Sequence, residues 1–266
     1  MLSNSFYDFK HVCKSVYWAI KNIHNFKKKE IIAQYVYFIR VFFLNVLIIK
    51  KVVQCPFCNW KGREFYPYPF WKLQDRKNVI CPRCLSMERH RATFLLMIKE
   101  SFFNNTYKVL HVAPEKSFEY FFKKNSSQYL SIDIDPKKAM RKEDITQLSF
   151  DDGSFDFICC SHVLEHIKDY TMGIKEINRV LTKTGRAILS VPFYPKLNKT
   201  IEYNEPDPDD AYHVRKIGID YLDLLKNAGF GIVKYFDCEK SFSKNDMEKN
   251  GLLGEYIIFA YKEHII

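Results

Sequence analysis

The stretch of residues 107–166 constrains the fold more than any other part of this 266-residue chain. Three short apolar runs, rich in β-branched and aromatic residues, lie at 107–112, 129–132 and 155–160. Each run ends at polar or turn-forming residues: Ala113-Pro114-Glu115, Asp133 and Ser161-His162. Such runs predict strands, and parallel strands bring their carboxyl ends together at one edge of a sheet. The sequence therefore predicts an α/β fold with its chemistry at these three strand ends.

The remainder of the chain after residue 166 continues the alternation of helices and strands. Apolar residues recur at helical spacing over 170–182 and 217–228, and β-rich runs lie at 186–191, 231–236 and 255–261. We expect the last two runs to be antiparallel partners that complete the sheet, with residues 240–254 as a polar loop between them. Residues 192–215 contain four prolines and lack clear periodicity. We expect this insertion to cover the site at the strand ends.

Charge is distributed unevenly along the chain. Residues 1–100 contain 18 Lys or Arg against 6 Asp or Glu, whereas residues 101–266 contain 23 against 25. A basic amino-terminal part favours an anionic partner, such as nucleic acid, an acidic membrane surface or a phosphorylated substrate. Ordinary solubilisation of a helical segment by lysine is the alternative. The composition, 47% hydrophobic and 27% charged, excludes a disordered chain.

Residues 1–54 form a basic and apolar segment with two expected helices. Residues 5–26 have amphipathic helical spacing. Residues 31–49 form an apolar run that would span roughly 28 Å as a helix, close to the thickness of a bilayer. Arg40 would lie near the bilayer centre at a cost of about 2.5–3.5 kcal/mol. Three interpretations of residues 31–49 are therefore open. The favoured one is a helix packed on the protein, and the alternatives are a peripheral membrane helix and a true transmembrane helix.

No cleavable signal peptide is visible, so we expect a cytoplasmic protein. If the helix over 31–49 is peripheral, the protein would contact the inner face of the membrane.

Four of the eight cysteines form two Cys-x-x-Cys pairs. Cys55-Pro56-Phe57-Cys58 and Cys81-Pro82-Arg83-Cys84 are separated by 22 residues. Two such turns are typical of one tetrahedral zinc ion held by four thiolates, with no open position and therefore a structural role. A redox pair is the alternative, although redox chemistry needs only one Cys-x-x-Cys motif. The sequence predicts a zinc-ribbon-like module over 55–100 that includes a linking helix at 92–99.

The segment between the second cysteine pair and that helix carries several charges. Ser86 is predicted to be the N-cap of the helix, with Glu88 in its first turn. Arg89 and Arg91 could bind a phosphate or a carboxylate of a substrate. They could equally be surface charges that pack the ribbon onto the following domain.

From residue 107 onward the chain resembles the class I S-adenosylmethionine-dependent methyltransferases of the type 11-like group. The resemblance covers about 160 residues and rests on the order and spacing of several motifs. They are Val109 to Glu115, Ser131-Ile132-Asp133, Glu143 to Phe150, Asp152 to Asp156, Val163 to Ile167, Arg179-Val180-Leu181, Thr184-Gly185, Leu189 to Pro192 and Ala228-Gly229-Phe230. With its Cys-x-x-Cys prologue, the whole chain resembles a bacterial subgroup of these enzymes. The resemblance implies a Rossmann-like, mostly parallel seven-stranded sheet over 101–266, with helices on both faces.

The resemblance also implies how S-adenosylmethionine would be bound. Asp133, followed by Ile134, would accept hydrogen bonds from the ribose hydroxyls, although Asp133 could instead form a turn with Asp135-Pro136. Asp144 would accept from the adenine amino group, with Ile145 against the ring. Ser161 and His162 would face the sulfonium.

The first loop departs from the family pattern, because His111, Ala113 and Glu115 stand where an acidic residue and a glycine-rich turn are usual. We expect these three residues to hold the methionine end of the cofactor, with Glu115 binding its ammonium group. Only Ala113 is small, and Pro114 offers no N–H group.

Transfer of a methyl group to a hydroxyl requires removal of its proton, for which histidine is suited near neutral pH. His213 and His162 are the candidate bases, although His213 could instead stabilise the covering insertion. Glu165-His166 is predicted to support the strand-to-helix geometry. Arg215 or Arg89 would hold an anionic group of the substrate.

Three functions are consistent with the sequence. The first is O-methylation of a sugar or another small-molecule precursor of the cell envelope, phosphorylated or lipid-linked. The second is methylation of RNA, gripped through the ribbon and the basic amino-terminal part. The third is an interaction module without catalytic activity.

Overall fold

The computed structural model describes residues 39, 43, 53–68 and 76–263. The helices predicted over 5–26 and 31–49 therefore lie outside the described residues, except for Ile39 and Phe43, which are both helical and exposed. None of the helices that the structure describes is both long and apolar enough to cross a bilayer. The described residues fall into two compact units.

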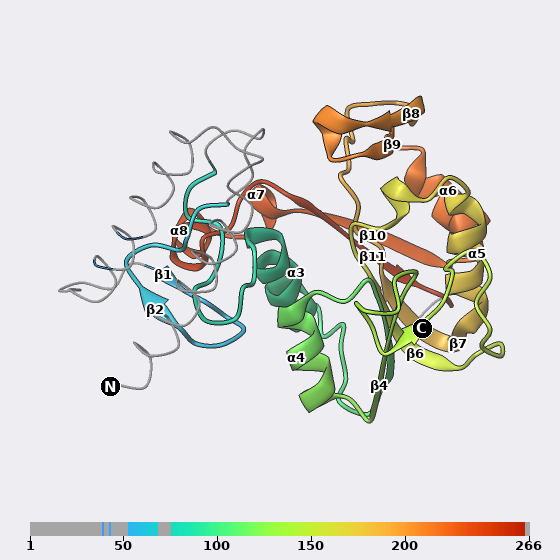
Figure 1. Cartoon of the computed structure of the whole chain (residues 1–266), viewed down its shortest axis with the longest axis horizontal. Coiled ribbons are helices and arrows are strands. Elements are labelled where there is room, and N and C mark those ends of the chain that lie inside the picture. Colours follow the sequence, from blue (N-terminus) through green and yellow to red (C-terminus); the bar gives the residue numbers. More distant parts are fainter. Residues whose placement is uncertain (1–38, 40–42, 44–52, 69–75, 264–266) are drawn as a thin grey trace. The chain divides into compact units, whose positions relative to one another are not determined.

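The larger unit, residues 96–241 and 254–266, is built on a seven-stranded sheet in the order β10-β11-β7-β6-β3-β4-β5 (Figure 1). The central strands β7, β6, β3, β4 and β5 are parallel, and β11 pairs antiparallel with both β7 and β10. The strands are β3 (Lys108–Val112), β4 (Gln128–Asp133), β5 (Arg141–Lys142), β6 (Phe155–Cys160), β7 (Leu181–Ile188), β10 (Ile232–Asp237) and β11 (Tyr256–Tyr261). The predicted fold class is confirmed, including the antiparallel pair that completes the sheet.

Helices cover both faces of this sheet because successive strand residues point to opposite faces. On β3, Leu110 faces a core that includes residues of α5 (Tyr170–Val180) and α6 (Tyr221–Asn227). On the other face, His111 of β3 packs against Phe122 of α4 (Lys116–Asn125), with ring centroids 5.4 Å apart. Figure 1 shows α4 on one side of the sheet and α5 and α6 on the other. Near-continuous apolar strands such as Phe155–Cys160 are explained by this burial on both faces.

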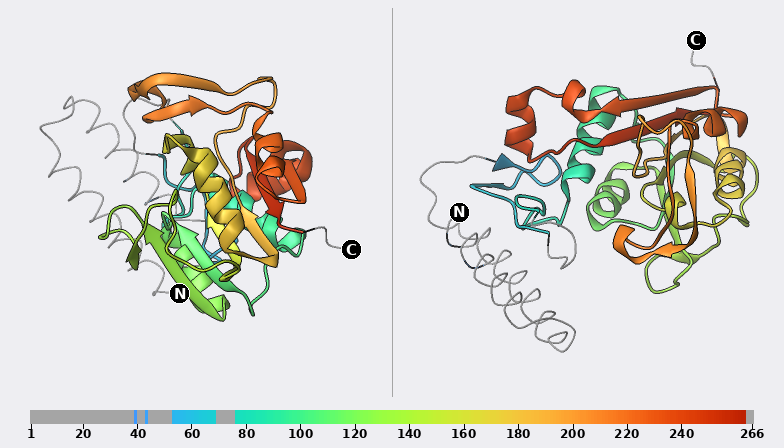
Figure 2. Two further views of the ribbon diagram at one scale, coloured as in Figure 1. Left: turned by 90° about the vertical axis from the view of Figure 1, so that its right-hand side faces the viewer. Right: turned by 90° about the horizontal axis from the view of Figure 1, so that it is seen from above.

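The expected covering insertion contains a hairpin of its own. The strands β8 (Ile201–Asp207) and β9 (His213–Lys216) pair antiparallel, with a single 3₁₀ turn at Pro208–Asp210 between them. Figure 2 shows this hairpin, in orange, outside the seven-stranded sheet. Its carboxyl-terminal strand contacts the short 3₁₀ helix η2 (Leu164–His166) that follows β6. The hairpin therefore meets the sheet unit at the carboxyl end of β6.

The smaller unit contains the two cysteine pairs and residues 242–253 from near the end of the chain. Its small sheet pairs β1 (Val53–Gln54) with β2 (Lys61–Gly62). The prediction of a polar loop over 240–254 was wrong, because α7 (Cys238–Ser241) and α8 (Lys244–Asn250) form there. Ser243 caps α8 by accepting a hydrogen bond from the Asp246 amide, and Gly251 ends it in a left-handed conformation. Ser243 and Gly251 are capping residues that the sequence shows. The polar composition of the segment nevertheless favoured the prediction of a loop.

A buried arginine holds this smaller unit together. Arg91, on α3 (Glu88–Lys99), is fully buried and stacks on the ring of Phe65, 3.9 Å from its centroid. Its guanidinium donates to the carbonyl oxygens of Val79, Ser86, Asn250 and Gly251 at 2.6–2.8 Å. Burial lowers the pKa of Arg91 to about 10, which still leaves it charged at neutral pH. One cation therefore ties residues 79–91 to the end of α8. The prediction that Arg91 binds a substrate anion or is a surface charge was wrong, because its guanidinium is buried and fully occupied by backbone carbonyls.

We expect Arg91→Met to lower the free energy of unfolding by about 3 kcal/mol or more, because buried carbonyls that lose a charged donor cost about 1–3 kcal/mol each. Urea denaturation followed by tryptophan fluorescence measures this loss. Arg83→Met is the matched control, since Arg83 is exposed and, among the residues that the structure describes, donates to the Cys58 carbonyl alone. A loss below about 1 kcal/mol is expected for the control, and an equal loss in both variants would contradict the role of Arg91.

Candidate functional site

The register of three parallel strands places their carboxyl ends side by side. Val112 of β3 is paired with Ile132 of β4 and with Cys160 of β6. The next residue of each strand or loop is therefore at the same edge of the sheet: Ala113, Asp133 and Ser161. The amide of Ala113 donates to the Ile132 carbonyl at 2.8 Å, which fixes the first loop beside β4. The structure thus brings together the three strand ends from which the site was predicted.

The first loop makes a tight turn without glycine. Ala113 has φ of +47°, in the left-handed region that glycine adopts most readily. A side chain there costs on the order of 1 kcal/mol, and the hydrogen bond to β4 helps to hold the strained conformation. Glu115 follows as the residue before α4, but its side chain does not cap the helix. The left-handed turn therefore forms here without glycine.

His111 and Glu115 form a pair beneath this loop. Nε2 of His111 lies 2.7 Å from Oε2 of Glu115, and Nδ1 lies 3.1 Å from the hydroxyl of Tyr129. His111 is fully buried against Phe122, whereas the side chain of Glu115 is 17% exposed. His111 therefore orients Glu115 from below. The carboxylate that was expected to bind an ammonium group is already in contact with an imidazole.

Asp133 and Asp144 have carboxylates that fit the acceptor roles expected of them. Asp133 ends β4, and its Oδ1 accepts a hydrogen bond from the amide of Asp135 at 2.8 Å. Asp144 is exposed, and its Oδ1 accepts from the amide and the hydroxyl of Thr146. Within the part of the chain that is described, no hydrogen bond reaches Oδ2 of either aspartate, so each retains an acceptor. These two acceptors therefore fit a nucleoside, whose hydroxyl and amino groups donate hydrogen bonds.

Two hydrophobic neighbours of these aspartates lie in different environments. Ile134 is 63% exposed at the edge of the sheet, where it is accessible to a ligand. Ile145 is buried in the core, packed against Gly173 of α5. Ile145 therefore stabilises the loop that carries Asp144, besides any contact it makes with a ligand.

His162 and Glu165 follow β6 in an unusual local conformation. His162 has φ of +55°, and its amide donates to the Ser190 carbonyl at 2.8 Å, which ties the turn to the segment after β7. Ser161, the residue before it, is buried. Glu165, on η2, is 1% exposed, and its Oε1 lies 3.3 Å from Nδ1 of His162. A buried carboxylate therefore lies directly beside a predicted base.

His213 reaches the same carboxylate from the β8–β9 hairpin. Its Nε2 lies 3.9 Å from Oε1 of Glu165, and its Nδ1 lies 3.2 Å from Oδ2 of Asp210. The ring of His166 is 4.8 Å from that of His213, between centroids. Asp210 was not identified from the sequence as a partner of His213. Its position on a tight turn, three residues before His213, could have suggested this contact. Oε1 of Glu165 therefore lies within 3.9 Å of both predicted bases, His162 and His213.

Arg215 has partners on every side-chain nitrogen. It is 2% exposed, and its Nε contacts both carboxylate oxygens of Glu202 at 3.0 Å. Its terminal nitrogens donate to the carbonyls of Leu164, Ile167 and Lys168, and its guanidinium stacks on Tyr170 at 3.9 Å. These contacts favour an anchoring role, in which Arg215 fastens the hairpin to η2. Contact with substrate stays a prediction for both Arg215 and Arg89, and Arg89 belongs to the smaller unit.

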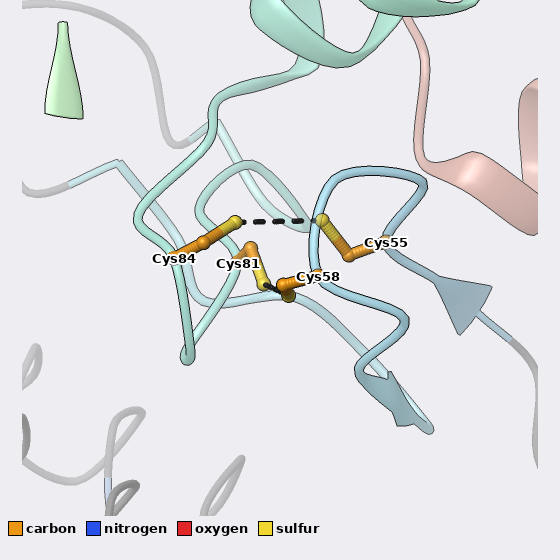
Figure 3. A group of neighbouring side chains, drawn as sticks. All are labelled: Cys55, Cys58, Cys81 and Cys84. Carbon is orange, nitrogen blue, oxygen red and sulfur yellow. Dashed lines mark hydrogen bonds between the residues drawn. The ribbon is translucent and has the colours of Figure 1, made fainter. Parts of the chain in front are cut away.

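The two cysteine pairs converge on one point in the smaller unit (Figure 3). Sγ of Cys55 is 3.5 Å from Sγ of Cys84, and Sγ of Cys58 is 3.6 Å from Sγ of Cys81. All four sulfurs lie within 4.8 Å of one another. Sulfurs around a tetrahedral zinc ion are about 3.8 Å apart at Zn–S lengths of about 2.3 Å. The cluster therefore has the ligand set and the dimensions of a zinc site.

The pKa values of the thiols in the cluster are shifted in opposite directions. Hydrogen bonds from Cys58, Cys81 and Cys84 hold the pKa of Cys55 well below its usual value, whereas the hydrogen bond with Cys55 raises the pKa of Cys58 and burial raises the pKa of Cys81. The hydroxyl of Ser86 lies 3.3 Å from Sγ of Cys55 and 3.2 Å from Sγ of Cys84. The prediction that Ser86 caps the helix was therefore wrong, since α3 begins at Glu88 and the hydroxyl contacts sulfur instead.

Comparison with known proteins agrees with the motifs. Residues 101–189 match the family described as a methyltransferase domain. An uncharacterized 37.1 kDa protein in transposon TN4556 of Streptomyces fradiae is 31% identical over 106 residues, which cover 36% of this chain and 30% of that protein. This chain thus spans less than a third of the transposon protein in the match.

Solved structures of S-adenosylmethionine-dependent methyltransferases are also similar. The enzyme from Mesorhizobium loti has a TM-score of 0.48 at 13% identity, covering 64% of this chain and 97% of that one. The enzyme from Archaeoglobus fulgidus has a TM-score of 0.45 at 16% identity, covering 65% and 94%. The match of residues 101–189, together with the motifs carried by the seven-stranded sheet, indicates a methyltransferase domain in the larger unit of this chain.

Proposed function

We propose that this protein transfers a methyl group from S-adenosylmethionine to a hydroxyl of a sugar or of another small-molecule precursor of the cell envelope. The observation that carries the proposal is the histidine and carboxylate cluster at the end of β6, where Asp210 faces Nδ1 of His213. An imidazole oriented by a carboxylate suits removal of a hydroxyl proton, which a methyl transfer to oxygen requires. The bound cofactor would supply an electrophilic methyl group on its sulfonium.

We propose that the strand ends hold this cofactor. Asp133 would accept from the ribose hydroxyls, with Ile134 beside them, and Asp144 from the adenine amino group, with Ile145 stabilising its loop. The loop of Ala113 would approach the methionine end, oriented by the His111–Glu115 pair. Ser161 and His162 would lie nearest the reacting carbon. The free Oδ2 acceptors of the two aspartates support this assignment.

The reaction would proceed as an in-line displacement. The substrate oxygen forms a bond to the methyl carbon, the carbon–sulfur bond breaks, and its electron pair remains on sulfur. The proton of the hydroxyl leaves to the cluster in which His213 and His162 flank Glu165. Positioning of the two reactants supplies much of the rate in such transfers. An anionic group of the substrate would be held by Arg89, or by Arg215 after exchange of its present partners.

The environment of the ribbon aromatics favours a small-molecule acceptor over RNA. Trp60, Phe65 and Tyr66 are all at most 4% exposed, so they serve the core of the smaller unit. Recognition of single-stranded RNA relies on exposed aromatic faces for base stacking. Contact of residues 31–49 with the inner face of the membrane stays a prediction, as does a cytoplasmic location.

We expect Asp133→Asn to weaken binding of S-adenosylmethionine by roughly 10- to 100-fold, because a hydrogen bond to a charged acceptor contributes about 1.5–3 kcal/mol. Isothermal titration calorimetry on the full chain measures the change. Asp151→Asn, an exposed turn residue, is the control and should bind like the wild type. Absence of binding by the folded wild-type protein would refute the methyltransferase proposal and favour an interaction module.

Replacement of His213 by alanine is expected to reduce the turnover of tritium-labelled methyl groups by roughly 10²- to 10⁴-fold, the contribution of general base catalysis. Labelled S-adenosylmethionine would be supplied with nucleotide-linked and lipid-linked sugar fractions and, separately, with total RNA. Glu205→Gln, an exposed acid on the same hairpin, is the matched control. Near-normal turnover in His213→Ala would remove this residue from proton transfer, and labelling of RNA alone would overturn the proposed substrate class.

We further propose that the four cysteines hold a structural zinc ion. The convergence of their sulfurs supports it, and four protein ligands leave no open coordination position. Zinc binding is expected to stabilise the smaller unit, because the ion replaces the protons that the sulfurs otherwise share.

Titration with a mercurial reagent should release one zinc ion per chain as four thiols react. Cys238→Ser provides the control, because burial raises the pKa of this thiol to about 12 and it lies outside the cluster. Its replacement should leave the zinc content unchanged. Zinc-free protein that folds and resists urea like the zinc-loaded form would contradict the proposed structural role.

A further inference from the structure

The carboxylate of Glu165 lacks the hydrogen bonds that a buried acid normally makes. Its side chain is 1% exposed, and neither Oε1 nor Oε2 has a hydrogen-bond partner among the residues that the structure describes. Burial of a carboxylate without compensation is costly, and such groups are usually paired or coordinate a metal ion. The two histidines nearest to it approach at 3.3 Å and 3.9 Å, without hydrogen-bond geometry. Something positively charged is therefore expected at this carboxylate.

The imidazole groups of His166 and His213 converge with Glu165 on one point. One ligand atom each from Glu165, His166 and His213 lies within 4.8 Å of the other two. Glu165 and His166 come from η2, and His213 comes from β9, so the cluster forms only when the hairpin packs against η2. All three residues belong to the same compact unit.

The Nδ1 atom of each imidazole faces an acceptor oxygen. Nδ1 of His213 lies 3.2 Å from Oδ2 of Asp210, and Nδ1 of His166 lies 3.4 Å from the carbonyl oxygen of Tyr212. Both oxygens can only accept, so they favour the tautomer that carries its proton on Nδ1 and leaves a lone pair on Nε2. This arrangement is typical of histidines that ligate metals, whose second nitrogen is oriented by a carboxylate or a carbonyl.

We propose that Glu165, His166 and His213 bind a divalent transition-metal ion, with zinc as the representative, at a second site independent of the four cysteines. Two imidazoles and one carboxylate form a donor set suited to such ions and leave at least one open coordination position. Ligand atoms around a tetrahedral zinc ion at about 2.0–2.2 Å are about 3.4 Å apart. The distance of 3.9 Å from Glu165 Oε1 to His213 Nε2 needs only a small closure to reach this value.

A protonated histidine paired with Glu165, either His162 or His213, is the competing explanation. An ion pair of that kind normally forms a hydrogen bond of about 2.7–2.9 Å. The observed distances of 3.3 Å from His162 and 3.9 Å from His213 are both longer than this, and Asp210 already lies beside the other nitrogen of His213. The structure therefore favours an ion between these groups over a direct contact.

The open position gives the ion a role that rests on the proposed function. A substrate hydroxyl bound there would lose its proton more readily, because a metal ion lowers the pKa of a coordinated oxygen. In the metal-loaded protein, His213 would hold the ion, and the proton of the coordinated hydroxyl would leave to His162, the other predicted base beside Glu165. Metal binding itself does not depend on methyl transfer.

Metal content tests the site directly. The full chain, dialysed against micromolar zinc and analysed by mass spectrometry, should retain two ions, one at the cysteines and one here. Glu165→Gln, His166→Ala and His213→Ala should each retain one, and Glu205→Gln should retain two. His166 is exposed, so its replacement tests the site even where a change of buried Glu165 prevents folding. One ion in the wild type, or two ions in the folded His166→Ala and His213→Ala variants, would overturn the proposal.

Cobalt provides a second measurement that separates the two sites. Added to protein whose cysteines already hold zinc, cobalt should give weak visible absorption without the intense sulfur charge-transfer band in the near ultraviolet. That absorption should be lost in His213→Ala, and its persistence there would count against the site. Calorimetry with S-adenosylmethionine on the same samples tests the proposed function independently. Two ions without cofactor binding would refute the methyltransferase proposal and retain the metal site.

Discussion

The hydrogen-bonded register of β4, β3 and β6 is the constraint on which the rest of the structure depends. Pairing of Val112 with Ile132 and with Cys160 aligns the three strand ends, so that Ala113, Asp133 and Ser161 come together from distant parts of the chain. A slip by one residue would turn every side chain of a strand to the opposite face. Burial of both faces makes such a slip costly, and the position of the proposed cofactor site follows from it.

Three buried charges illustrate different ways in which this protein compensates for lost hydration. Arg91 and Arg215 each donate to several backbone carbonyls and stack on an aromatic ring, so each fastens two separate segments. Glu165 has no such partners among the described residues and lies beside histidines at distances too long for strong bonds. Arg91 and Arg215 show how a buried charge with a structural role is hydrogen-bonded in this protein. Because Glu165 lacks such hydrogen bonds, we assign a ligand to it.

The first loop forms a left-handed turn without glycine. Ala113 adopts the left-handed conformation that glycine would adopt without strain, fixed by its hydrogen bond to Ile132. His111 and Glu115, which replace other family features, pair with each other at 2.7 Å. The loop is therefore shaped by contacts within the sheet rather than by glycine, and its fit to the methionine end of the cofactor depends on those contacts.

The sequence by itself determined the features that depend on local pattern. Alternating apolar runs predicted the strands and the α/β sheet, and the spacing of Cys55, Cys58, Cys81 and Cys84 predicted their convergence, because each pair needs only one tight turn. Tertiary structure alone decided which distant groups meet. The approach of His213 to Glu165, the carbonyl partners of Arg215 and the inclusion of residues 242–253 in the smaller unit all join segments far apart in the sequence. No local periodicity encodes such contacts, since they arise from the packing of whole elements.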